Sequence, residues 1–430
     1  MHLWLLPVSY VAMSVLAAFT FPRIEHAYLA SYKLGLSVSS VQAYLSAAAS
    51  GMMALTAIVF SIAFVMVQFS AIAYSPRLVL LFVRDRTLFH TLGIFVATFV
   101  YSLALLAWID RNGSGYVPMF STLLVAMMVI VSVVLFSLLV QRLNDLQISN
   151  VLHVIGDRGR QVIHAMYPRR DDKTVDVQKA RRDIAGSILL GPVTQTLTYS
   201  GKPRAIASYD IGVLVREAQK ADAVIVMASA VGDTLVETAV ILRVYRARTM
   251  LPDDRLMRGL RLATERTFDQ DPKFALRLLV DIAIKALSPA INDPTTAVQT
   301  IDQIEDLLHR LGQRELDAGK IRDNKGHLRL VFPAPTWDDY LALAFDEIRQ
   351  FGANSVQVMR RLRSALIAVA EPLTNSGQAD AVLQYLKHLD LVIDHSSFDP
   401  EDRIAARQED RQGLGLSRFH TDTKGLVTGR

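Results

Sequence analysis

Four long runs of apolar residues occupy the first third of the chain. They are Leu3–Phe21, Gly51–Ala73, Leu88–Ile109 and Val117–Val140, and none contains Asp, Glu, Lys or Arg. About 20 apolar residues in a helix cross the roughly 30 Å hydrocarbon layer of a membrane, whereas buried helices of soluble proteins are usually shorter. The pattern therefore predicts four transmembrane helices. The first run lacks the basic start of a signal peptide, so we expect it to be retained.

The cations that flank these runs predict the orientation, because Lys and Arg are more frequent on the cytoplasmic side of a membrane. Six lie on one side of the predicted membrane: Arg77, Arg84, Arg86, Arg142, Arg158 and Arg160. Three lie on the other: Arg23, Lys33 and Arg111. We therefore expect the N-terminus and everything after Val140 to be cytoplasmic, in a bacterial inner membrane. Arg77, Arg84 and Arg86 would meet lipid phosphates there or stand at the inner mouth of a pore.

A polar stripe follows the second run. Ser50, Ser61, Gln68 and Ser75 are spaced 11, 7 and 7 residues apart. At 100° per residue they return to within about 20° of one helix face. Two interpretations compete. Small and hydroxyl residues ordinarily line seams between packed membrane helices. Alternatively, the stripe lines an aqueous path in an oligomer, as a weakly selective pore requires.

Charge and cysteine content narrow the function classes. The net charge is +5 and Cys is absent, which excludes disulfides, thiolate metal sites and cysteine nucleophiles. Nine Lys or Arg against five Asp between Arg142 and Arg182 indicate attraction to anionic lipid head groups. Basic residues are not interleaved with aromatic ones, so no nucleic-acid partner is expected.

The rest of the chain predicts an α+β body in several parts. Residues 1–141 form the transmembrane domain and 142–186 a basic helical linker. Residues 187–247 alternate strand-like runs and turns around a short helix, Ile211–Lys220, which indicates a small β-barrel-like domain. The Met-Lys or Asp-Lys turn that carries biotin or lipoate in carrier domains is absent from this segment, so no cofactor is expected. Residues 248–395 are mainly helical, and 396–430 form a polar, partly disordered tail.

Local signals place elements in the helical part. Asp271-Pro272 and Asp293-Pro294 both combine an N-cap residue with proline in the first turn, so a helix is expected after each. The two helices would form a hairpin around Asn292. Arg255–Thr267 has apolar residues on one side and basic ones on the other, which predicts a further helix. Asn324-Lys325-Gly326 is typical of a turn between two short strands.

Catalytic signatures are missing from the sequence. It has no phosphate-binding loop, no dinucleotide fingerprint, no H-E-x-x-H and no G-x-S-x-G, so we expect no enzyme. His388, Asp390, Asp394 and His395 match no strong metal spacing, so no metal is expected. Asp281 and Lys285 are four residues apart and form either an ion pair that supports the helix or a buried functional pair. The candidate motif of the body comprises Asp271, Asp281, Lys285, Ser288, Asn292 and Asp293.

Three stretches give the chain a family resemblance. The first joins Gln68-Phe69-Ser70 to Tyr74–Arg77 and Arg84-Asp85-Arg86, and the second starts at Leu92-Gly93 and reaches Tyr101. The third and most specific runs from Arg266 to Asp271-Pro272 and from Ala286 to Asp293-Pro294. The chain resembles, as far as about His395, a bacterial family of predicted inner-membrane proteins, domain-of-unknown-function family twenty-two fifty-four. It departs at Glu237-Thr238, where the family pattern tends to have glycine. The resemblance implies a membrane location and no activity.

Two functions fit these observations. The leading hypothesis is a homo-oligomeric channel or channel-like protein, because four helices alone enclose little space and a pore usually needs several copies. Ser61 and Gln68 would face the path, and the cytoplasmic body would form a vestibule or gate. The alternative is a membrane-tethered sensor or scaffold, whose helical hairpin at Ser288–Asp293 binds a ligand or partner.

Overall fold

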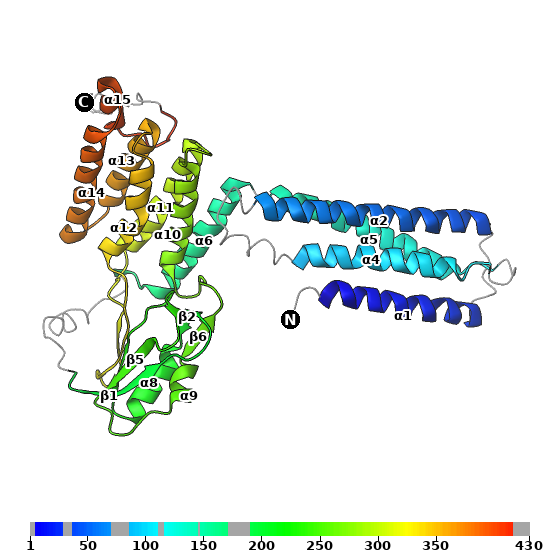
Figure 1. Ribbon diagram of the computed structural model, residues 1–430, viewed down its shortest axis with the longest axis horizontal. Helices are drawn as coiled ribbons and strands as arrows, with labels where there is room; N and C mark the ends of the chain where they lie inside the picture. The colour runs from blue at the N-terminus through cyan, green and yellow to red at the C-terminus, as the bar shows by residue number, and fades with distance from the viewer. Residues whose placement is uncertain are drawn as a thin grey trace, which may run out of the picture. The chain divides into compact units, whose positions relative to one another are not determined.

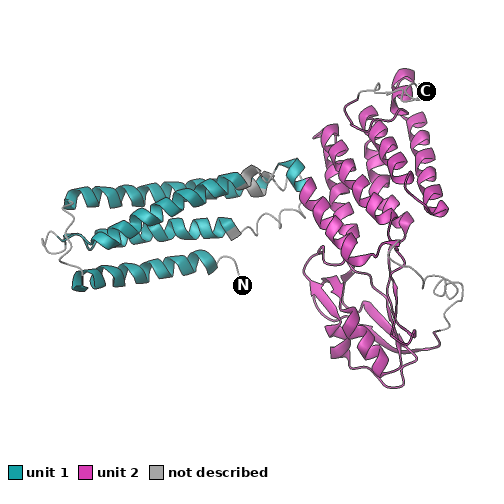
Figure 2. Ribbon diagram, turned by 180° about the vertical axis from the view of Figure 1, so that it is seen from behind, with its two compact units in different colours: residues 1–151 teal, residues 152–430 magenta. Residues whose placement is uncertain are grey.

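The computed structural model describes residues 5–28, 37–69, 86–110, 116–144, 147–170 and 190–415. The chain divides into two compact units, residues 1–151 and 152–430 (Figures 1 and 2). We call them unit 1 and unit 2. Ser75, Arg77, Arg84 and parts of the basic linker, residues 145–146 and 171–186, lie outside the described residues.

Unit 1 contains the four expected apolar helices. They are α1 (Leu5–Tyr28), α2 (Val38–Phe69), α4 (Arg86–Leu106) and α5 (Met119–Asn144). All four are long and apolar enough to cross a membrane. Helix α4 packs against each of the other three, and its Phe95, Tyr101 and Leu105 are buried.

The bounds of two of these helices differ from the sequence prediction. Helix α2 begins at Val38 rather than Gly51, because residues 38–50 carry no charge and are rich in Ala and Ser. The Ser37 hydroxyl starts the helix by accepting a hydrogen bond from the Ser40 amide at 3.1 Å. Helix α1 continues past Phe21 to Tyr28, which brings Arg23 and Glu25 into a helix expected to be free of charge.

Glu25 links the end of α1 to the start of α5. Glu25 is only 5% exposed, and its carboxylate accepts three hydrogen bonds. Oε1 accepts from the Phe120 amide at 2.8 Å, and Oε2 accepts from the Ser121 amide at 3.0 Å and the Ser121 hydroxyl at 2.8 Å. The first amides of a helix lack partners within the helix and carry partial positive charge, so a carboxylate there satisfies both needs.

Unit 2 contains two open sheets. The larger has the order β1-β5-β3-β8-β7 and the smaller β4-β2-β6. Among the described strands, only the β3–β8 pairing is parallel. The strands are β1 (Val193–Thr198), β2 (Arg204–Tyr209), β3 (Val224–Met227), β4 (Thr234–Leu235), β5 (Val240–Tyr245), β6 (Leu260–Ala263), β7 (Lys320–Arg322) and β8 (Leu328–Val331).

The expected small barrel is wrong. A barrel closes only when its edge strands pair, but β8 and β7 arrive from far along the chain and extend the sheet beside β3. Strand β2 belongs to the second sheet, where it pairs with β6.

The prediction of a helix over Arg255–Thr267 is also wrong. Gly259 ends a short helix, α9 (Asp253–Arg258), and β6 follows because Leu260 and Leu262 pair with β2.

Helices form the other part of unit 2. They are α6 (Ile148–Met166), α8 (Ile211–Lys220), α10 (Pro272–Ala286), α11 (Pro294–Gly312), α12 (Trp337–Phe351), α13 (Val356–Ala370), α14 (Ser376–His395) and α15 (Pro400–Ala406). The predicted α8 and the two Asp-Pro helix starts are confirmed. Helices α10 to α14 stand side by side, away from the sheets (Figure 1). Helix α10 lies among α11 and α12, and Leu276, Leu279 and Val280 are fully buried.

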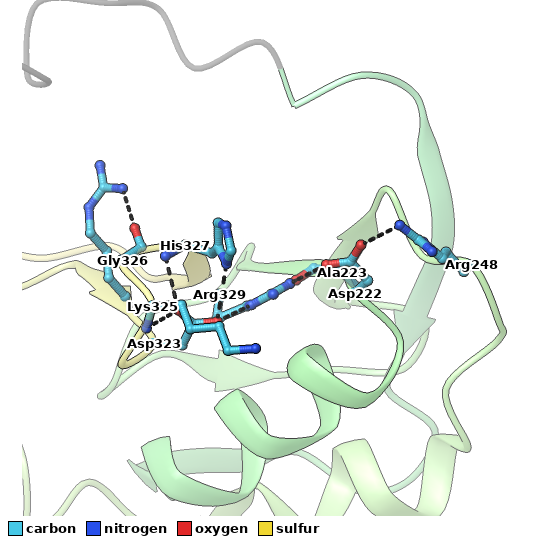
Figure 3. A network of polar contacts seen from close by, with 9 residues as sticks. Asp222, Ala223, Arg248, Asp323, Lys325, Gly326, His327 and Arg329 are labelled. Carbon is cyan, nitrogen blue, oxygen red and sulfur yellow. Dashed lines mark hydrogen bonds and ion pairs between the residues drawn. The ribbon is translucent and has the colours of Figure 1, made fainter.

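A polar network fastens the predicted hairpin β7–β8 to β3 (Figure 3). Asp323 Oδ1 accepts from the Lys325 and His327 amides at 2.9 Å, and Oδ2 accepts from Arg329 Nε at 2.8 Å. Arg329 Nη1 also donates to Asp222 Oδ1 at 3.0 Å, just before β3. The turn at Asn324-Lys325-Gly326 is thus confirmed, and Arg329 joins it to a strand that lies far away in the sequence.

We expect Glu25→Gln to lower the stability of the full chain. The amide keeps the shape but loses the charge, and its NH₂ group opposes the amide donors of α5. The expected loss is about 1 to 3 kcal/mol, the usual effect of removing a charged hydrogen-bond partner from a buried site. Thermal unfolding followed by circular dichroism in one detergent would measure it. Ser121→Ala removes only one of the three hydrogen bonds and should have a smaller effect. An unchanged transition in Glu25→Gln would contradict this role.

We also expect the Asp323 network to lose strength in acid. The hydrogen bond from Arg329 lowers the pKa of Asp323 from its usual 3.8 to about 2. A carboxyl whose folded pKa is depressed stabilises the fold above its unfolded pKa, and this contribution disappears as the pH falls from about 4 towards 2. Asp323→Asn should therefore destabilise the chain at pH 7 and differ progressively less from the wild type below pH 4. Unfolding midpoints over this pH range would test it, with the exposed Asp317→Asn as a control that shows no such difference.

Candidate functional site

The predicted polar stripe lies on the outward face of α2. Ser50, Ser61 and Gln68 are all exposed on the surface of unit 1. The other exposed residues on this face are the small Ala43, Ser46, Ala47, Ala54 and Ala57 and the large apolar Phe64 and Val65. The buried face of α2 is different, since it carries Val41, Leu45, Met52 and Val59. Helix α2 therefore presents an apolar face to its own unit and turns its serines and Gln68 outward, among small residues and two large apolar ones.

Hydroxyl residues elsewhere in unit 1 behave differently. Thr91, Thr98 and Ser102 of α4 are fully buried, and each donates to the carbonyl four residues earlier at 2.7–2.8 Å. Ser132 of α5 does the same. These side chains form the seam between packed helices that the helix-packing interpretation describes. The outward face of α2 takes no part in that seam.

The side chains of the three arginines expected at the inner mouth of a pore lie outside the described part of the structure. Arg77 and Arg84 lie outside the described residues, and Arg86 is the first residue of α4 with its side chain outside the description. Their assigned roles stay predictions.

The hairpin between α10 and α11 uses its polar groups internally. Ser288 Oγ donates to the Lys285 carbonyl at 2.7 Å, and the Asn292 amide donates to the Ser288 carbonyl at 2.9 Å. Asn292 has φ of 49°, the left-handed conformation that reverses the chain here. Asp293 caps α11 by accepting from the amide and hydroxyl of Thr296 at 3.1 and 2.6 Å. These contacts build a connection between two helices.

Two further acids of the candidate motif also pair with arginines. Asp281 lies 2.5 Å from Nη2 of Arg277, whose guanidinium also donates two hydrogen bonds to Glu347 of α12. The hydrogen bonds that Arg277 donates to Glu347, and then the one to Asp281, raise the pKa of Arg277. Burial lowers the pKa of Lys285. Asp271 does not cap α10 through its side chain but pairs through Oδ2 with Arg266, and its Oδ1 is buried without a hydrogen-bond partner among the described residues.

No metal-binding group of three His, Asp or Glu side chains occurs in the described ranges. In the stretch His388–His395, Asp390 pairs with Arg363 and Asp394 pairs with Arg407.

Unit 2 contains a cavity of about 330 Å³ that no sequence pattern predicts. Its lining comes from the end of α6, the start of α10, β7 and the loops after β2, β3 and β8. Apolar side chains dominate it, and Lys273 and Asp269 are its charged members. These residues are up to 170 positions apart, from Ala165 to Pro335, so no local pattern could have grouped them.

Comparison with known proteins gives a family and no activity. The sequence profile described as "Predicted membrane protein (DUF2254)" matches residues 1–368. The uncharacterized proteins Mb1321c of Mycobacterium bovis and Rv1290c of Mycobacterium tuberculosis are each 29% identical over 338 residues, which is 76% of this chain. The chain spans only 63% of the length of these relatives, and no solved structure matches it. With four membrane-length helices followed by an α+β unit, the chain belongs to the DUF2254 family of predicted membrane proteins.

Proposed function

We propose that the protein is a homo-oligomeric channel or channel-like protein in which α2 lines the path. Unit 2 would lie on the cytoplasmic side of the inner membrane as a vestibule or gate. Anionic lipid head groups would contact the basic residues that follow α5. The proposal rests on one observation: Ser50, Ser61 and Gln68 lie on the face that α2 turns away from its own unit.

In a membrane, the polar side chains on this face of α2 need hydrogen-bond partners. Hydrocarbon offers no hydrogen-bond partners, so polar side chains there turn to protein or to water. A serine hydroxyl can bond to its own helix, as Ser102 and Ser132 do. The carboxamide of Gln68 has two donors and an acceptor, which is more than one helix turn supplies. In an oligomer whose α2 helices surround a common axis, this face would contact water and the α2 helices of the other copies.

In the alternative, a membrane-tethered sensor or scaffold, the hairpin at Ser288–Asp293 binds the ligand or partner. The contacts of Ser288, Asn292 and Asp293 are those of a helix connection, which weakens the hairpin as a binding point. The cavity in unit 2 is the observation that favours a ligand-binding role.

Ion flux from proteoliposomes tests the channel. We expect wild-type protein to conduct, and Gln68→Leu to change the flux several-fold without altering the oligomeric state, because it removes one polar group from the path. Ser61→Phe should block the path. Phe60→Leu is the matched control, since Phe60 is exposed on another face of α2. Liposomes that stay tight with wild-type protein under every pH, voltage and tension would refute the proposal.

The absence of cysteine allows a second, independent test. Ser50→Cys and Ser61→Cys introduce single thiols on the polar face, and Phe60→Cys introduces one on a different face. A charged, membrane-impermeant thiosulfonate should modify the first two quickly and the third slowly, because only a thiol in contact with water ionises and reacts. Equal protection of all three thiols would indicate that α2 is covered by lipid or by packed helices rather than by water.

A further inference from the structure

The cavity in unit 2 lies where both sheets meet the helices. The two tyrosines Tyr167 and Tyr209 contribute to its walls together with Phe332 and the proline-rich segment 333–335. Small-molecule sites are typically 300–1,000 Å³, largely apolar, with a few polar groups that orient the ligand. At about 330 Å³ this cavity is at the small end of that range.

Most polar side chains in the lining already have partners. Tyr167 and Tyr340 share a hydrogen bond between their hydroxyls at 2.9 Å. The Tyr209 hydroxyl donates to the Ser229 carbonyl. Gln270 is held at both ends of its amide by the Tyr209 backbone, at 2.9 and 3.1 Å. None of these groups needs a ligand.

The two charged groups of the lining differ in their partners. Asp269 is paired with Arg261, with 3.1 Å between Oδ2 and Nη1. Lys273 makes one long hydrogen bond, from Nζ to the Val231 carbonyl at 3.4 Å, and no carboxylate lies within 4.0 Å of it among the described residues. An ammonium group has three donors, so Lys273 retains unused capacity beside an apolar cavity.

Asp339 is close enough to Lys273 to feel its charge, but it is bound elsewhere. Hydrogen bonds from the Thr336 backbone and hydroxyl are the main cause of the lowered pKa of Asp339, and the charge of Lys273 adds a smaller contribution. Asp339 closes the capping box of α12 with Thr336. Asp339 therefore holds the start of that helix and forms no ion pair with Lys273.

The start of α10 also favours an anion at this cavity. Pro272 and Lys273 are its first two residues, and the Asp271 side chain turns to Arg266 instead of capping the helix. The first turn of α10, which carries partial positive charge, thus contributes Pro272 and Lys273 to the cavity lining.

We propose that this cavity binds a small organic anion that has an apolar body and one carboxylate. The carboxylate pairs with Lys273, and the apolar body lies against Phe332, Ile321 and the prolines. This site is separate from the face of α2, and its existence does not depend on whether the protein conducts.

Calorimetry on the full-length protein in nanodiscs tests the proposal, with 3-phenylpropionate as the probe. We expect saturable binding of one probe per chain. Its uncharged amide, 3-phenylpropionamide, should bind at least about tenfold more weakly, because a charge-assisted hydrogen bond to Lys273 is lost. Lys273→Met should weaken phenylpropionate binding by a similar factor and leave amide binding almost unchanged.

Two variants keep the test decisive. Lys387→Met makes the same charge change at an exposed position on α14 and should bind like the wild type. Ala318→Leu fills part of the cavity while it keeps Lys273, and should weaken both probes. Circular dichroism would confirm that each variant is folded. Absence of phenylpropionate binding to the wild type, equal binding of acid and amide, or unchanged binding to Lys273→Met would each overturn the proposal.

Discussion

A buried polar group must find a partner within the protein, and this constraint organises both units. In unit 1, Glu25 accepts three hydrogen bonds at the start of α5, and the hydroxyls of α4 bond to their own helix. In unit 2, Arg329 joins the hairpin β7–β8 to β3 through two aspartates. The contacts of Glu25 and Arg329 also tie together segments that are distant in the chain. Leaving the groups unpaired would cost more than the contacts contribute.

The two candidate sites both set polar groups beside apolar surfaces. The outward face of α2 carries Gln68 and serines on a helix that is long and apolar enough to span a membrane. Lys273 lies at an apolar cavity without an ion-pair partner among the described residues. By contrast, the hairpin at Ser288–Asp293 looks like a functional motif in the sequence, yet its contacts are those of a helix connection. Unmet polar capacity is therefore a better guide here than the density of polar residues.

Membership of the DUF2254 family places the chain among predicted membrane proteins, and the mycobacterial relatives are themselves uncharacterized. The proposed pore face and the proposed anion site lie in different units and are independent proposals. Each part is testable alone, since thiol accessibility on α2 and probe binding at Lys273 use different variants and different measurements.

The sequence by itself determined the features that depend on neighbouring residues. Four charge-free runs predict four membrane-length helices, Asp271-Pro272 and Asp293-Pro294 predict two helix starts, and Asn324-Lys325-Gly326 predicts a turn. Hydropathy, capping and turn chemistry all act over a few positions, so a local pattern contains them. Only the tertiary structure decided that the strands form two open sheets instead of a barrel, that Glu25 caps α5, and that a cavity surrounds Lys273. These features depend on pairing between segments up to 170 residues apart, which one sequence does not encode as a readable period.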